Sequence, residues 1–266
     1  MKIDRVLLDT IHELAIEAGK AIMRVYAGDF EVNTKEDRSP VTEADMAAHH
    51  LIEAGLRKLA PDLPVLSEEG ADIPYTTRSQ WPRYWLVDPL DGTREFIKRN
   101  GEFTVNIALV EGHDVVLGMV HAPALGMSYG AFRGGGAWKW EGGEARSIQA
   151  RAQATRPPCV AVSRSHGSAR MQAYLAALGE HAHINMGSAL KSCLVAEGTA
   201  DLYPRLGPTS EWDTAAAQCV VEEAGGHVTD TAMQRLRYNT KDSLLNPEFF
   251  VFGDASINWS AYLPGP

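Results

Sequence analysis

The chain has 266 residues, of which 45% are hydrophobic and 22% are charged, and its formal net charge at pH 7 is −9. This length supports one large domain or two closely joined halves with a sizeable buried core. An acidic chain lacks the electropositive footprint that long nucleic acid requires, so an anionic substrate would need metal ions or a few placed Lys and Arg residues as counter-charge.

The cysteine count and the hydropathy pattern indicate the cellular compartment in which we expect the protein. Cys159, Cys193 and Cys219 are too few and too widely spaced for a disulfide framework or a zinc site, and we expect free thiols in a reducing cytosol. We expect no integral membrane segment and no signal peptide, hence a cytoplasmic protein. We leave open attachment at the inner face of a bacterial inner membrane, although no basic amphipathic helix supports it. We also leave open a homodimer.

The first part of the chain reads as two helices. Apolar residues at helical spacing predict a helix that ends near Tyr26. A polar loop follows from Asn33 to Pro40. Thr42 is predicted to cap a second helix, with Asp45 completing a near capping box, and Pro61 to end it.

The middle of the chain reads as β-structure and the last part as alternating strands and helices. Runs rich in β-branched and aromatic residues predict strands over 84–87, 103–110 and 115–121, then a strand, a glycine turn and a strand across 132–138. Beyond Pro157-Pro158 we expect strands at 159–162 and 249–252 and helices at 168–178, 188–197 and 213–224. Such alternation is typical of an α/β unit.

The strongest chemical signal lies between residues 85 and 93, where an apolar run ends in two carboxylates. Asp88 and Asp91 flank Pro89 and Leu90. Oxygen-rich groups of this kind are the ligands that Mg²⁺ prefers. Because the proline restricts the turn, both carboxylates and the Leu90 carbonyl can face one point.

The residues after this pair suggest an anion site. Asp91 is predicted to cap a following helix, whose free N–H groups at Gly92 and Thr93 would face an anion. Taken in isolation, the same segment favours an aspartate-capped turn without a metal.

Two further acidic positions complete the candidate set. Glu68-Glu69 follows a short apolar run, and Asp213 lies in Glu211–Ala216. Taken singly, they read as a solvated loop and an ordinary helix cap. Together with the two aspartates they could hold two ions, as in the two-metal sites that catalyse phosphoryl transfer.

The order of these motifs resembles that of a known superfamily, the inositol monophosphatases. The matching segments are Val41–Asp45, Glu68-Glu69, Asp88–Thr93, Trp212–Ala215 and Glu223–Gly226. The resemblance covers nearly the whole chain. It implies a Mg²⁺-dependent, lithium-sensitive phosphatase.

The same resemblance implies the fold. We expect a layered α-β-α-β-α sandwich of the inositol monophosphatase and fructose-1,6-bisphosphatase type. Residues 1–156 would form an α+β half with two helices on an antiparallel sheet and most metal ligands. Residues 157–266 would form an α/β half that carries Asp213 and the elements that select the substrate.

The resemblance also implies a set of metal ligands. Glu68, Asp88 and the Leu90 carbonyl would hold a first Mg²⁺ ion. Asp88, Asp91 and Asp213 would hold a second, with two or three ions in all.

The same motifs imply the catalytic residues. Thr93, paired with Asp45, would orient and help to deprotonate the attacking water, and Glu68 would assist.

Within the superfamily the chain is similar to the 3′(2′),5′-bisphosphate nucleotidases. The segments that carry this similarity are 88–109, 163–166, 187–191, 194–198 and 203–209. These enzymes convert adenosine 3′,5′-bisphosphate into AMP and phosphate and clear a by-product of sulfate assimilation. The expected partner is therefore a small nucleotide bisphosphate.

Several residues are predicted to hold that substrate. Ser188 is expected to begin a helix after Gly187 and to meet the phosphate or ribose. Lys191 and Arg205 suit the retained 5′-phosphate, and His166 the base or a phosphate. Each could instead be a surface charge or a helix cap. The predicted substrate contacts are completed by Gly92, Thr93 and Asp213.

Two alternative functions stay open. The same metal chemistry would serve an inositol-1-phosphatase or another small sugar-phosphate phosphatase, including one acting on fructose 1,6-bisphosphate. A non-catalytic sensor of nucleotide bisphosphates is the second alternative, although the complete ligand set favours an enzyme.

Overall fold

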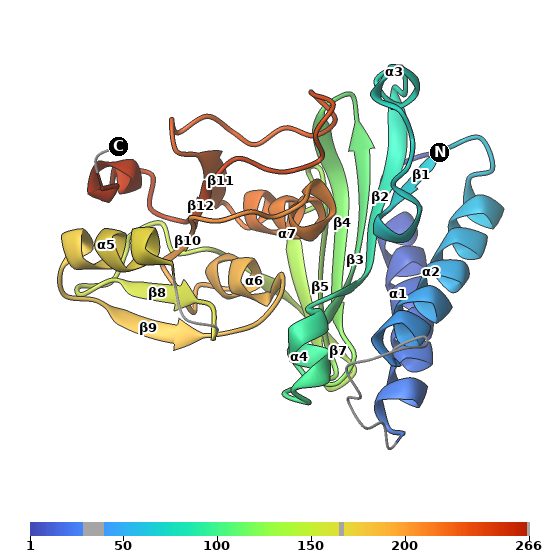
Figure 1. The fold of residues 1–266 in the computed structure, drawn as a ribbon, viewed down its shortest axis with the longest axis horizontal. Helices are drawn as coiled ribbons and strands as arrows, with labels where there is room; N and C mark the ends of the chain where they lie inside the picture. The colour runs from blue at the N-terminus through green and yellow to red at the C-terminus, as the bar shows by residue number, and fades with distance from the viewer. Residues whose placement is uncertain (29–39, 165–167, 265–266) are drawn as a thin grey trace.

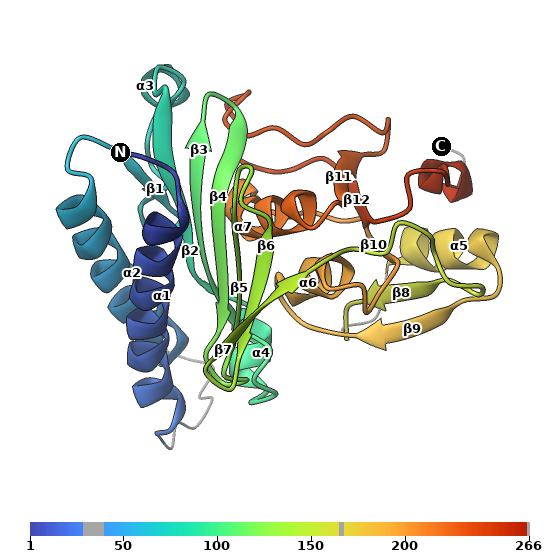
Figure 2. The same cartoon turned by 180° about the vertical axis from the view of Figure 1, so that it is seen from behind.

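The computed structural model describes residues 1–28, 40–164 and 168–264. Its elements stack in five layers, in the order helices, sheet, helices, sheet, helices (Figures 1 and 2). This arrangement confirms the predicted layered α-β-α-β-α fold. The predicted contact residue His166 lies outside the described residues.

Helices α1 (Arg5–Tyr26) and α2 (Pro40–Leu59) form the first layer. The buried residues of α1 recur at helical spacing along one face, and the Asp4 carboxylate caps the helix by accepting a hydrogen bond from Leu7 N at 3.1 Å. Helix α2 begins two residues before Thr42, so the predicted cap at that residue is wrong. Proline is well suited to a first helical position, because its missing N–H would have had no helical partner there.

The second layer is a seven-stranded sheet in simple sequence order. Strand β1 pairs parallel with β2, and every later pair is antiparallel. Tight turns, one of them at 133–136, connect most of the strands. The strands are β1 (Val65–Ser67), β2 (Arg83–Asp91), β3 (Thr104–Glu111), β4 (Asp114–Ala122), β5 (Met127–Phe132), β6 (Ala137–Glu141) and β7 (Glu144–Ile148).

Both faces of this sheet are covered, because side chains alternate along each strand. Trp85 and Val87 of β2 pack toward α1 and α2, whereas Tyr84 and Leu86 pack toward the central helices. Three short helical segments lie beside the sheet: η1 (Glu68–Gly70), α3 (Tyr75–Arg78) and α4 (Thr93–Ile97).

The central layer consists of α6 (Leu190–Ala196) and α7 (Glu211–Glu223), which lie between the two sheets (Figure 1). Helix α7 approaches strand β4 so closely that a Cβ atom at Gly118 would lie 2.1 Å from the Ala216 carbonyl oxygen. The predicted start of α6 at Ser188 is wrong. That residue has a φ of 48°, in the left-handed region, and the helix starts after it.

The second sheet has five strands in the order β11-β12-β10-β8-β9. The predicted strands at 159–162 and 249–252 are confirmed as β8 and β12. Phe249 and Val251 face the central helices, whereas Phe250 and Phe252 face the outer helices. The remaining elements are β9 (Ala182–Asn185), β10 (Leu202–Arg205), β11 (His227–Asp230), α5 (Ala169–Leu178) and η2 (Trp259–Tyr262).

The division of the chain into halves at Pro157 stays a prediction. The strands of the first sheet precede this residue and those of the second follow it, but α7 from the later part packs on the first sheet. All three cysteines are free thiols, with Cys159 half-buried and the other two buried. None of the helices in the described part of the chain combines the length and apolarity needed to span a membrane.

The close approach of α7 to β4 generates a prediction about stability. Gly118→Ala would force the helix away from the sheet, and we expect a loss of about 1–3 kcal/mol of unfolding free energy. Thermal unfolding would show a drop of roughly 2–4 °C per kcal/mol. Gly207→Ala is the matched control, because its Cβ atom meets open space. Equal Tm values for the two variants would contradict this account of the packing.

Candidate active site

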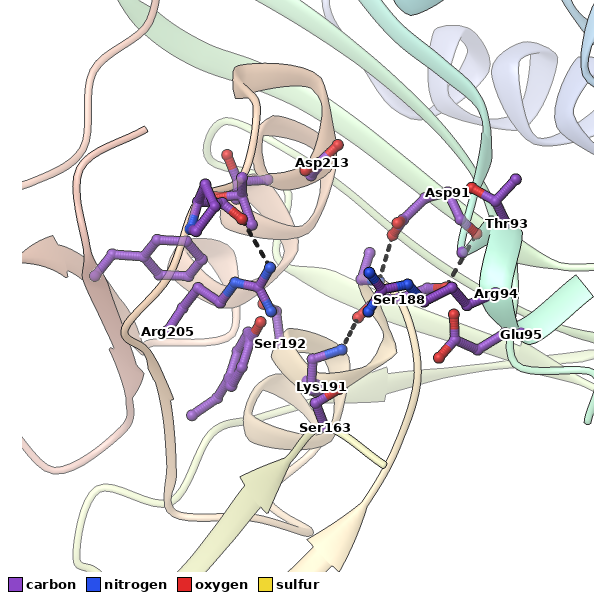
Figure 3. Close-up of a pocket in the computed structure, with 17 residues that line it drawn as sticks. Asp91, Thr93, Arg94, Glu95, Ser163, Ser188, Lys191, Ser192, Arg205 and Asp213 are labelled. Carbon is purple, nitrogen blue, oxygen red and sulfur yellow. Dashed lines mark hydrogen bonds between the residues drawn. The ribbon is translucent and has the colours of Figure 1, made fainter. Parts of the chain in front are cut away.

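A cavity of about 490 Å³ opens where the end of β2, the start of α7 and the turn before α6 meet. Figure 3 shows its side chains: Asp91 and Asp213 lie on one side, and Lys191 and Arg205 on the other. The cavity therefore has an acidic part and a basic part. Asp91 comes from a segment at least 100 residues before the one that contains the other three groups.

A bulge in β2 brings its two aspartates together beside this cavity, which Asp91 lines. Asp88 and Asp91 are three positions apart, which would place them on opposite faces of a regular strand. Asp88 pairs with Asn106 on β3. Asp91 pairs with Thr104, so two intervening residues of β2 oppose only one residue of β3. A bulge of this kind re-aims side chains, and Pro89 within it needs no ladder hydrogen bond.

Asp213 reaches the same point from the first turn of α7. Its carboxylate accepts a hydrogen bond from Ser210 N at 2.9 Å, and the Ser210 side chain accepts one from Asp213 N, which forms a capping box. The aspartate is therefore the third residue of the helix and not its cap.

Three carboxylates converge as a result. Oxygen atoms of Asp88, Asp91 and Asp213 lie within 4.8 Å of one another. Burial, followed by the negative charges of its neighbours, raises the pKa of Asp88 well above its ordinary value. Burial and the Asp213 carboxylate raise the pKa of Asp91 to about 7. Burial also raises the pKa of Asp213, against the lowering effect of the Ser210 N–H.

Two further predicted acids lie beside this cluster. Burial and the charges of Glu69 and Glu68 raise the pKa of Asp45 to about 8. Partial desolvation raises the pKa of Glu68, and Asp91 adds to that rise. Glu68 follows β1, which pairs with β2 so that Ser67 stands opposite Val87, one residue before Asp88.

This donor set fits a divalent cation. Crowded carboxylates with raised pKa values repel one another, and a hard cation with oxygen ligands relieves that repulsion. Asp45 Oδ1 is moreover buried without a hydrogen-bond partner. A second group of candidate ligands, His49, His50 and Glu53, lies on α2, where Glu53 accepts a hydrogen bond from Arg57 at 2.8 Å.

Asp91 has a different partner from the one predicted. Its Oδ2 accepts a hydrogen bond from Ala189 N at 2.7 Å, and it does not cap α4. Gly92 holds the cap position with a φ of 96° and no side-chain bond, and a Cβ atom there would lie 2.1 Å from Ser188 Oγ. Glycine is therefore required at this position both by conformation and by space. The predicted anion contacts of Gly92 and Thr93, which line the cavity, stay predictions.

The basic part of the cavity contains the two predicted cations. Lys191 is buried, donates from Nζ to the Ser188 carbonyl at 2.7 Å, and lies 5.3 Å from the centre of the Tyr203 ring. Burial lowers its pKa to about 8, and nearby Arg205 contributes to this lowering. Arg205 donates to the Pro208 carbonyl at 2.8 Å, and its buried Nε has no partner.

Other predicted substrate residues are already engaged within the protein. Gly187 N donates to Glu102 Oε2 at 2.8 Å. Ser188 Oγ shares its single hydrogen between the carbonyls of Asp91 and Glu102, at 3.0 and 2.7 Å. Their contacts with a substrate stay predictions.

The predicted Thr93–Asp45 pair is not joined by a hydrogen bond in the described part of the structure. Thr93 nevertheless lines the cavity at the start of α4. Its role toward water, and that of the Leu90 carbonyl toward a metal, stay predictions.

Sequence reasoning missed two groups at the cavity, Glu95 and Tyr203, which line it. Arg94 also lines it, and the sequence alone left open whether this residue belongs to a solvated helix face or lies near the site. Glu95 closely follows the recognised motif, so its position near Thr93 was a usable signal. Tyr203 offered no local signal, because an aromatic residue in a short apolar strand usually indicates core packing.

Comparison with known proteins identifies the family. A model of the inositol monophosphatase family matches residues 4–253. The chain is 55% identical over 248 residues to the 3′(2′),5′-bisphosphate nucleotidase CysQ of Shigella flexneri, over 92% of this chain and 99% of that protein. The corresponding protein of Salmonella typhimurium is 55% identical over 247 residues, with the same two shares covered.

Solved structures agree with this match. CysQ from Bacteroides thetaiotaomicron, a bacterial member of the inositol monophosphatase family, superposes with a TM-score of 0.84 at 40% identity, covering 92% of this chain and 96% of that one. An inositol monophosphatase from Zymomonas mobilis gives a TM-score of 0.79 at 25% identity, covering 96% of both chains. The chain therefore belongs to the inositol monophosphatase family.

Proposed function

We propose that this protein hydrolyses the 3′-phosphate of adenosine 3′,5′-bisphosphate to give AMP and phosphate, with Mg²⁺ as its cofactor. The observation that carries this proposal is one cavity that Asp91 and Asp213 line on one side, where Asp88 converges with them, and that Lys191 and Arg205 line on the other. A substrate with two phosphates fits such a divided site, because one phosphate can be cleaved while the other is held. The similarity to bisphosphate nucleotidases supports the same substrate class.

The acidic side would hold the metal ions. Asp88, Asp91 and Asp213 supply the converging oxygens, and Glu68 with the Leu90 carbonyl completes the proposed set for two or three ions. When bound there, Mg²⁺ would neutralise charge on the transferring phosphate and acidify a water molecule. Thr93 and the buried Asp45 carboxylate would orient that water for in-line attack and take its proton.

The basic side would hold the phosphate that is not cleaved. Lys191 and the unpaired Arg205 Nε are desolvated donors, and a desolvated donor gains most from an anion. A phosphate beside Lys191 would also raise the pKa of this amine and keep it protonated. We place the reaction in the cytoplasm and in the clearance of a by-product of sulfate assimilation.

The experiment that tests this function compares substrates. Purified protein in Mg²⁺ would be given adenosine 3′,5′-bisphosphate, inositol 1-phosphate or fructose 1,6-bisphosphate at equal concentration, and phosphate release measured. We expect at least about a 100-fold preference for the nucleotide, equivalent to roughly 3 kcal/mol of differential transition-state binding. Preference for inositol phosphate would refute the substrate assignment, and binding without turnover would indicate a sensor.

The variant Lys191→Ala tests whether the cavity selects a substrate with two phosphates. An inositol monophosphate has no second phosphate for this residue to hold. The variant should therefore lose much more kcat/KM on the nucleotide than on inositol 1-phosphate. Equal losses on both substrates would remove the main support for a bisphosphate.

The metal assignment predicts the effect of removing one carboxylate. Asp91→Asn and Asp213→Asn should each lower turnover by more than about 100-fold, because losing a direct ligand exceeds the 10–100-fold cost typical of outer-shell changes. Circular dichroism should show an unchanged fold. Asp9→Asn, at an exposed carboxylate paired with Arg5, is the matched control. Near-normal turnover in either site variant would contradict the assignment.

The raised pKa of Asp91 predicts a pH effect on the metal-free protein. Its pKa is about 7 in the folded state, against about 4 in the unfolded chain, so the unfolded chain loses this proton first as pH rises. The stabilising contribution of this group to the free energy of unfolding is therefore fully present below about pH 4, and it is lost as the pH rises to about 7. In a chelating buffer, Asp91→Asn should gain stability over the wild type between pH 5 and 8, on the order of 2–4 kcal/mol.

The comparison between wild type and variant is needed because other groups titrate in the same range. Burial lowers the pKa of His121 to about 4, which makes stability rise with pH as the unfolded histidine loses its proton. This contribution is the same in both proteins and cancels in the difference. A Tm difference that stays constant from pH 5 to 8 would disprove the predicted linkage.

A further inference from the structure

A buried carboxylate outside the proposed catalytic set lies between the start of β3 and the turn that precedes α6. Glu102 precedes strand β3 by two residues and is 6% exposed. Its Oε2 accepts hydrogen bonds from Gly187 N and from Arg164 Nε, both at 2.8 Å, and its Oε1 accepts a second bond from the same guanidinium. A bidentate arginine pair satisfies the buried charge and fixes the orientation of the carboxylate.

Glu102 thereby holds one end of the 187–189 turn. The middle of the turn is held by Ser188 Oγ, which donates to the carbonyl oxygens of Asp91 and of Glu102 itself. The other end is held by Ala189 N, which donates to Asp91 Oδ2 at 2.7 Å. Three consecutive residues of the turn are thus bonded to the ends of β2 and β3.

The turn needs these bonds because its conformation is unfavourable. Ser188 has a φ of 48°, which a residue with a side chain rarely adopts unless its surroundings impose it. The turn also lies very close to its neighbours: a Cβ atom at Gly187 would lie 2.6 Å from Glu95 Cγ and 2.7 Å from the Glu102 carbonyl oxygen. Without the Glu102 carboxylate, the turn would lose the charged acceptor of Gly187 N that holds it in this conformation.

Both sides of the cavity depend on this turn. Ala189 N orients the Asp91 carboxylate, a proposed metal ligand. The Ser188 carbonyl accepts a hydrogen bond from Lys191 Nζ at 2.7 Å and so places the amine that would hold the second phosphate. A shift of the turn would therefore disturb cation binding and substrate binding together.

We propose that Glu102 is a positioning residue, which acts through the 187–189 turn to hold Asp91 for the metal and Lys191 for the substrate. Outer-shell groups of this kind typically change metal affinity by about 10–100-fold when removed. The effect on Lys191 rests on the proposed function, whereas the effect on cation binding at Asp91 does not.

The test uses Mn²⁺ as a paramagnetic probe of the full-length protein. Free Mn²⁺ measured by electron paramagnetic resonance gives its affinity in the absence of substrate. Glu102→Ala should weaken Mn²⁺ binding by at least about 10-fold. Glu102→Gln, which keeps an acceptor for Gly187 N, should recover most of this loss.

The matched control is Glu111→Ala at the end of β3, whereas Glu102 lies just before the start of that strand. Glu111 pairs with Arg83 and Arg133 on the surface, so its removal also breaks a Glu–Arg interaction on β3 but far from the turn. We expect unchanged Mn²⁺ affinity in this variant. An equal loss in both alanine variants would overturn the proposal, because the effect would then come from general destabilisation.

The substrate arm measures KM and kcat for adenosine 3′,5′-bisphosphate at saturating Mg²⁺. Glu102→Ala should raise KM by at least about 10-fold, because Lys191 would be displaced, and it should lower kcat by a smaller factor. Wild-type Mn²⁺ affinity together with wild-type KM would overturn the proposal. If the wild type itself fails to hydrolyse the nucleotide, the proposed function fails, but the Mn²⁺ arm still decides the role of Glu102.

A further variant covers the case in which Glu102→Ala does not fold. Ser188→Ala leaves the Glu102–Arg164 pair intact and removes only the hydroxyl, whose hydrogen is shared between the carbonyls of Asp91 and Glu102. Its Mn²⁺ affinity should also fall, by about 10-fold. An unchanged affinity in this variant would show that the turn does not control Asp91, and would overturn the proposal.

Discussion

Three carboxylates of like charge are held within 4.8 Å of one another, and much of the structure serves to keep them there. Burial, and then the charges of neighbouring carboxylates, raise the pKa values of all three, which means that the metal-free fold holds them against an electrostatic cost. Each is restrained by backbone: Asp88 Oδ1 accepts from Leu90 N, Asp91 from Ala189 N, and Asp213 from Ser210 N. The same crowding makes the site a strong candidate for divalent cations.

The layered fold explains how such distant residues meet. The bulged end of β2 belongs to the first sheet, and the start of α7 lies between the two sheets (Figure 1). Because α7 packs against the backbone of β4 at Gly118, its first turn is placed rigidly relative to β2. The five-stranded sheet then contributes Arg205 at the end of β10, so that acidic and basic groups face one cavity from different layers.

Local pattern was a good guide wherever local physics decides the outcome. The helix up to Tyr26 and the strands at 159–162 and 249–252 follow from spacing and β-propensity, and the structure has them with the predicted bounds. Predictions failed where a distant segment intervenes. Ser188 does not begin a helix, and Asp91 does not cap one, because each bonds to the other's segment, nearly a hundred residues away.

The sequence by itself determined the chemistry. The acidic motifs, the order in which they occur and the family follow from residue types and spacing, which depend only on the chain. Tertiary structure decided the geometry and therefore the electrostatics. Only the folded chain brings Asp213 to Asp88, makes Lys191 a buried amine with a lowered pKa, and places Glu102 on the 187–189 turn. Distances and desolvation arise from contacts between separate layers, and no local pattern encodes them.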